Sequence, residues 1–192
     1  MGIGTRAAAA AVATIMGASA LLAGTSTATA APAPSVSGKA VLAWNAKCPS
    51  MSQSLKPVRP ASNQGGRLSL PVTAATGRQI SLGGALQLFN SGAFYGNFVD
   101  PAIPIAGTNA ANFVVTWPDQ QQLTNFPLFH VADFKKAGKA KTREWTGILQ
   151  APIAEFNTVP ATFVADLLGR MCGAPIVPGD TLGTIKVTVK SS

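Results

Sequence analysis

Short runs of alternating apolar and polar residues constrain this chain most. Residues 67–72 and 79–82 alternate with period two, as do Ile185, Val187 and Val189 in the run 182–189, and Gly or Pro stands between such runs. Alternation puts every second side chain on one face of an extended strand, so these runs predict half-buried β-strands joined by turns. Spacings of roughly 8–12 residues predict an all-β fold, and we expect an immunoglobulin-like antiparallel β-sandwich.

One short C-terminal helix interrupts this pattern. Thr158 is the expected N-cap, Pro160 fits the first turn and Gly173 fits the C-cap. Five apolar residues between them fall on one helical face: Phe163, Val164, Leu167, Leu168 and Met171.

The first thirty residues predict a signal peptide, residues 1–30. Arg6 precedes an uncharged, Ala-rich stretch over residues 7–23, and Ala28 and Ala30 form the small-x-small pattern of a cleavage site. Residues 31–38 are the expected disordered leader and residues 39–192 the β-sandwich domain. No second long apolar run follows, so we expect no transmembrane segment in the mature chain. The expected location is secreted, extracellular or associated with the cell envelope.

Two cysteines, Cys48 and Cys172, lie in the expected mature part. An even pair in an oxidising compartment favours one disulfide, which would join the start of the domain to its end. The alternative, a catalytic thiol, needs a nearby base, and the chain holds one histidine.

Three segments of the chain, residues 80–88, 97–107 and 113–115, resemble the exported HtaA-type domains of Gram-positive bacteria. That family consists of β-sandwich domains that take up haem, so the resemblance implies a β-sandwich and an HtaA-like carrier of haem or of a small apolar ligand.

The haem ligands of that family are not matched. A Tyr ligates the iron there, and a His hydrogen-bonds it. The family's His follows a Gly in the strand matching residues 81–88, where this chain has Gly84. The family's Tyr follows a Trp in an N-terminal strand, and here no Tyr lies between Trp44 and Tyr95. We therefore expect the architecture to carry over and no cofactor to bind, with haem as the alternative.

Tyr95 and His130 are the single residues of their types and the candidate ligand-binding pair. Together they are able to hold an iron-bound ligand, with an apolar pocket from neighbouring Phe94, Phe98, Leu128 and Phe129. The alternative is that each is an ordinary strand residue with its polar tip in solvent.

The net charge is +8, and its densest run is the candidate anion-binding cluster of Lys135, Lys136, Lys139, Lys141 and Arg143. Exported basic proteins meet anionic surfaces, so an anionic cell-envelope polymer or another surface protein is the expected partner. The alternative is a solvated loop. Nucleic acid is not expected, because no aromatic residue interleaves the lysines to stack bases.

No motif for catalysis is present. The chain has no Gly-x-Ser-x-Gly elbow, seven acidic residues in all and one histidine, so neither a serine triad nor a zinc site is expected. The sequence therefore predicts a secreted, non-enzymatic binding or structural module of unknown ligand, with the HtaA-like carrier as the alternative.

Overall fold

The computed structural model describes residues 36–105, 110–121, 123–137 and 142–191. The signal peptide expected over residues 1–30 lies outside these ranges. The contacts divide the chain into residues 1–33 and 34–192, and all described residues belong to the second unit.

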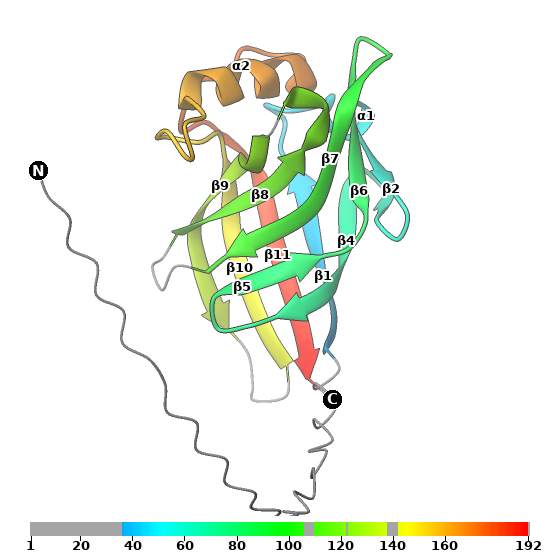
Figure 1. Cartoon of the computed structure of the whole chain (residues 1–192), viewed down its shortest axis with the longest axis vertical. Coiled ribbons are helices and arrows are strands. Elements are labelled where there is room, and N and C mark those ends of the chain that lie inside the picture. The colour runs from blue at the N-terminus through cyan, green and yellow to red at the C-terminus, as the bar shows by residue number, and fades with distance from the viewer. Residues whose placement is uncertain (1–35, 106–109, 122, 138–141, 192) are drawn as a thin grey trace, which may run out of the picture. The chain divides into compact units, whose positions relative to one another are not determined.

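The described residues form a chain of short strands with one long helix (Figure 1). The elements in order are β1 (Val36–Trp44), α1 (Met51–Ser54), β2 (Leu55–Val58), β3 (Ser62–Gln64), β4 (Arg67–Ala75), β5 (Gln79–Leu82), β6 (Ala85–Asn90), β7 (Ala93–Pro104), β8 (Ala110–Trp117), η1 (Pro118–Gln120), β9 (Leu123–Ala137), β10 (Thr142–Gln150), α2 (Ala161–Cys172) and β11 (Thr181–Ser191). Strand β1 begins at Val36, so it includes Val36, Ser37 and Gly38, which the sequence assigned to the leader.

The strands close into an antiparallel barrel of eight. The pairing order β7-β5-β4-β1-β11-β10-β9-β8 returns to its start through a β7–β8 pairing, while β6, β2 and β3 attach outside the ring. The immunoglobulin-like sandwich expected from the sequence is therefore wrong. Alternation fixes which face of a strand is buried, but sandwiches and barrels share it; only the β7–β8 pairing decides between them.

Strand β7 makes this closure because it changes partner along its length. Its first half pairs with β6, with Leu86 opposite Phe98, and its second half pairs with β5, with Ile80 opposite Ile103. Asp100 lies between the halves with φ +50°, and the β7–β8 register shifts between Val99 and Ala102. Such an irregularity bends a strand and increases its twist. The Asp100-Pro101 pair thus lies inside one long strand, β7.

The barrel interior is the core. Alternating residues of β4 and β11 are buried as their patterns predicted, and they join the aromatic side chains of β7, β8 and β9 in one apolar cluster. Helix α2 lies across one end of the barrel (Figure 1) and buries Val164, Leu168 and Met171.

The helix ends as predicted but begins differently. Gly173 is the C-cap with φ +71°, and its N–H donates to the carbonyl of Gly169 at 3.0 Å. The N-cap is Pro160 rather than Thr158. Phe163, expected on the buried face, is 45% exposed. Among the described residues, no helix is both long and apolar enough to cross a membrane.

Candidate functional site

His130 lies on the outer wall of the barrel, in β9. Its neighbours Phe129 and Val131 point into the core and are fully buried, so alternation turns His130 outward. Asn112 is its register partner on β8. The Nδ1 atom of His130 lies 3.3 Å from Oδ1 of Asn112. Because an amide oxygen only accepts, Nδ1 carries the proton and donates, and Nε2 keeps its lone pair.

The His130 imidazole is half-buried, and its burial lowers its pKa below the usual value of 6.5. The ring is therefore neutral at neutral pH. A neutral imidazole with one nitrogen oriented by a hydrogen bond and the other bare is the form that ligates metals.

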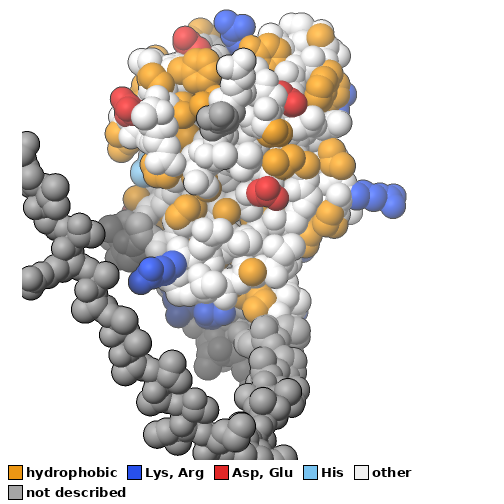
Figure 2. All heavy atoms as spheres, viewed as in Figure 1, with side chains coloured by type: hydrophobic (Ala, Val, Ile, Leu, Met, Phe, Trp, Pro, Cys, Tyr) orange, Lys and Arg blue, Asp and Glu red, His pale blue; other side chains and the backbone are white. Residues whose placement is uncertain are grey.

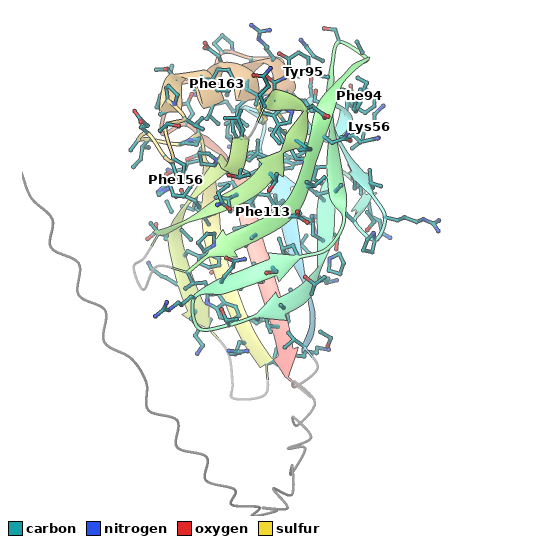
Figure 3. The ribbon with its side chains drawn as sticks, in the orientation of Figure 1. Lys56, Phe94, Tyr95, Phe113, Phe156 and Phe163 are labelled. Atoms are coloured by element: carbon teal, nitrogen blue, oxygen red, sulfur yellow. A yellow bond between two sulfur atoms is a disulfide. The ribbon has the colours of Figure 1, made fainter. Side chains whose placement is uncertain are left out.

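A groove of about 220 Å³ runs beside this ring. The barrel wall supplies Asn112, Pro127 and His130. The segment that follows β10 supplies the opposite side, including Pro152, Ile153 and Phe156, of which Phe156 is labelled in Figure 3. Ile153 is 61% exposed. An exposed branched side chain beside two prolines makes this groove mainly apolar, with Glu155 as its acidic group.

Hydrogen bonds hold the groove's outer wall in place. Phe156 and Val159 exchange backbone hydrogen bonds at 3.2 and 2.9 Å, which closes a tight turn after the wall. Before it, the N–H of Ala151 donates to the carbonyl of Asp180 at 2.9 Å. Asp180 also pairs with Lys47 at 2.6 Å, and this contact lowers the pKa of the Asp180 carboxyl. These contacts therefore fix the position of the groove's outer wall.

Tyr95 lies at a different site. It is 47% exposed, and its ring centroid is 6.1 Å from that of Trp117 at the end of β8. Asn112, beside His130, is five residues earlier on that strand, which is about 17 Å of strand length. Hydrophobic side chains cover this end of the domain, around α2 and the tip of β7 (Figure 2).

The aromatic pocket expected around the pair does not form either. Phe98, Leu128 and Phe129 are fully buried in the core, and Phe94 is 53% exposed. The two candidate ligands thus stand apart, each with its own surroundings. The sequence analysis did not identify Asn112 or the Pro152–Phe156 wall. Their positions beside His130 depend on strand register and on the return of the chain after β10.

The lysine cluster lies on the β9–β10 hairpin. Lys135 is paired with Asp133 at 3.2 Å, and the Arg143 guanidinium lies 5.9 Å from the Trp145 ring centroid. Lys136 is exposed. Lys139 and Lys141 lie outside the described residues. Anion binding by this cluster stays a prediction.

Cys48 and Cys172 form the expected disulfide, and both are fully buried. The bond connects the segment before α1 to the last residue of α2. In the part of the chain that the structure describes, no three His, Cys, Asp or Glu side chains gather as a metal site would require.

The two positions that correspond to the haem ligands of HtaA-type domains hold no ligand. Gly84 has φ +92°, and an added Cβ would lie 2.7 Å from the backbone nitrogen of Ala61, so a histidine does not fit there. Trp44 packs against Phe129, with ring centroids 5.6 Å apart, and no tyrosine follows it in α1 or β2.

Comparison with known proteins gives a likeness of fold. No family model matches the chain, and no curated protein matches it. The solved structure of the heme binding protein HtaB from Corynebacterium glutamicum superposes with a TM-score of 0.53 and 13% identity, covering 83% of this chain and 96% of that one. The C-terminal domain of HtaA from the same organism gives a TM-score of 0.56 and 8% identity, covering 83% and 100%. The HtaA-type resemblance noted in the sequence is thereby confirmed at the level of fold.

This likeness corrects the expectation that the domain takes no cofactor. That expectation rested on two unmatched positions, Gly84 and the residues after Trp44. Because the fold resembles that of a heme binding protein, residues outside those two positions are also candidates for holding a ligand. His130 is one of them.

Proposed function

We propose that this domain is an exported, non-enzymatic carrier of haem or of a similarly flat apolar ligand, and that His130 is the residue that ligates the iron. The observation that carries the proposal is the His130–Asn112 pair: a neutral imidazole with a bare Nε2 beside an apolar groove. The fold likeness to HtaB supports haem as the ligand. Haem would supply an iron atom that accepts an imidazole lone pair.

The residues of the groove fit one part of such a ligand. Ile153, which is 61% exposed, offers most of the apolar surface to a flat ring system, while Pro127 and Pro152 line the groove as buried residues. The groove volume of about 220 Å³ is below the roughly 300–1,000 Å³ of pockets that enclose a ligand. A haem-sized molecule therefore stays partly in solvent. No lysine or arginine lines the groove, so anionic groups on the ligand's edge are best left in water. A partly exposed ligand suits a carrier protein that transfers its ligand to another molecule.

The export expected from the sequence supports a carrier working outside the cytoplasm. His130, the sole histidine of the chain, contacts the Asn112 amide through Nδ1, an arrangement that suits the proposed binding role.

A haem titration of the mature protein tests the proposal. The wild-type protein should show a saturable shift of the Soret absorption band. His130→Ala should abolish this shift. Asn112→Leu should weaken binding by about 10–100-fold, because it removes the group that orients the imidazole.

Tyr95→Phe is the matched control. It removes the other candidate ligand atom and keeps the ring that contacts Trp117, so the titration should match that of the wild type. Loss of the band in Tyr95→Phe with its retention in His130→Ala would move the ligand to Tyr95. No saturable shift in the wild type would overturn the proposed function.

Haem affinity should also fall with acidity. A protonated imidazole has no lone pair for iron, and the pKa of His130 in the folded protein lies below 6.5. Affinity should be constant above pH 6.5 and should decrease as the pH falls through that lowered pKa. The unfolding free energy should fall as the pH decreases from 6.5 to that lowered pKa, because in this range the unfolded chain, with the higher pKa, binds the proton more readily. Haem titrations at several pH values measure the affinity, and urea denaturation at the same pH values measures the unfolding free energy. In His130→Gln the decrease in unfolding free energy that comes from His130 should be absent.

A further inference from the structure

A second cleft, separate from the His130 groove, is lined by residues of α1, the β6–β7 hairpin and the C-terminal part of α2. Figure 1 shows where these elements lie. Its volume is about 620 Å³, which is within the range of pockets that hold small molecules. Neither the sequence analysis nor the comparison with known folds assigns a role to it.

The charges in this cleft have one sign. Lys56 from β2 and Arg170 from α2 line it, and no acidic residue does. Among the described residues, neither of these two side chains forms an ion pair. The Lys56 ammonium lies 4.1 Å from the centroid of the Phe89 ring, which keeps it on the wall of the cleft. Figure 3 labels Lys56 at this end of the molecule. Two cations that form no ion pair among the described residues favour an anionic ligand.

The rest of the lining is rich in hydroxyl groups. Four of the lining residues are serines, Ser50, Ser52, Ser54 and Ser91, and Gln53 adds an amide. Hydroxyls and amides donate to phosphate oxygens and also accept from the hydroxyls of a polyol. The lining therefore matches a ligand that carries both groups.

The disulfide holds the two walls together. Cys48 precedes α1 and Cys172 ends α2, and their bond joins the side of the cleft bearing the serines to the helix bearing Arg170. The N–H of Ser50 also donates to the carbonyl of Cys172 at 3.4 Å. From the far side, Asn63 donates through Nδ2 to the carbonyl of Ser52 at 3.3 Å. A cleft fixed before binding loses less entropy when it takes its ligand.

From this cleft we propose a binding site for a phosphate-bearing polyol, with Lys56 and Arg170 contacting the phosphate and the serines contacting the hydroxyls. The chemistry is shared by free glycerol phosphate and by a polymer built from it. The site is independent of the proposed haem function, since no residue lines both the cleft and the groove.

Calorimetric titration of the mature protein with glycerol phosphate tests this site. Saturable binding is expected for the wild type, and glycerol without phosphate should not bind. Lys56→Gln and Arg170→Gln should each weaken binding at least about tenfold, because each removes a charged hydrogen-bond partner. Lys190→Gln, which removes the same charge from β11, is the matched control and should leave binding unchanged.

The outcomes separate the alternatives. Tighter binding of poly(glycerol phosphate) than of the monomer supports the site and identifies the polymer as its source, and the reverse identifies the free compound. If Lys190→Gln weakened binding equally, the loss of affinity would come from net charge alone, and this result would overturn the proposal. Binding of anionic lipid vesicles without binding of glycerol phosphate would overturn it as well. His130→Ala should leave the glycerol phosphate titration unchanged. The haem proposal and the proposal for this cleft are therefore tested independently.

Discussion

The Cys48→Ala/Cys172→Ala double variant should lose about 4–5 kcal/mol of unfolding free energy. The disulfide spans 124 residues, and cross-linking a loop of this length removes much of the entropy of the unfolded chain. Both sulfur atoms are also buried where α1 meets α2, so their removal leaves a small cavity. For a domain of this size the loss corresponds to a melting temperature lower by roughly 10–20 °C.

Urea denaturation and thermal melting under oxidising conditions measure this loss. The wild type in the presence of a reductant should approach the double variant, and the double variant should not respond to reductant. A double variant within about 1 kcal/mol of the wild type would show that the bond adds little beyond the packing around it. The same variant should bind glycerol phosphate more weakly, because the bond joins the two sides of the cleft.

Phe98→Ala should lower the unfolding free energy by about 3–5 kcal/mol. Phe98 is fully buried in β7. Its ring centroid lies 5.0 Å from that of Trp117 in an edge-on arrangement and 5.9 Å from that of Phe126 in a stacked one. Such aromatic pairs each add about 0.5–1.5 kcal/mol to the effect of burial. The three rings come from β7, β8 and β9, so the variant weakens the packing behind the strand pairing that closes the barrel.

Phe94→Ala is the matched control for this variant. It removes the same ring from the same strand at a position that is 53% exposed, so its cost should stay below about 1 kcal/mol. Fluorescence of the buried Trp117 during urea denaturation reports both variants. Equal losses at Phe94 and Phe98 would mean that the cluster around Trp117 is not the centre of stability that its burial implies.

Much of the local structure could be predicted from the sequence. Strands β4, β5 and β11 lie where period-two alternation placed them, and Gly173 ends α2 because a helix that stops in a left-handed conformation favours glycine. The pairing of Cys48 with Cys172 followed from their being two cysteines in a chain predicted to be exported. Export itself stays a prediction.

The sequence identified the residue types of the candidate site but not their positions relative to one another. His130 was selected as the single histidine, and Tyr95 with it, but pairing them assumed that rarity implies proximity. Register places His130 opposite Asn112, and the bulged start of β7 places Tyr95 beside Trp117. The cleft lined by Lys56 and Arg170 could not be predicted from the sequence, because these two residues lie more than a hundred positions apart and line one cleft only in the folded domain.

Sequence alone determined that this chain forms strands with one helix near its C-terminus, and which side of β4, β5 and β11 is buried. These properties are local, since they depend on the alternation of neighbouring side chains and on single turn residues. Tertiary structure decided that the strands close into a barrel, that His130 faces outward beside Asn112, and that Lys56 and Arg170 line one cleft. Those features depend on which strands, distant in the sequence, pair with each other. The period-two alternation within one strand does not specify its partner.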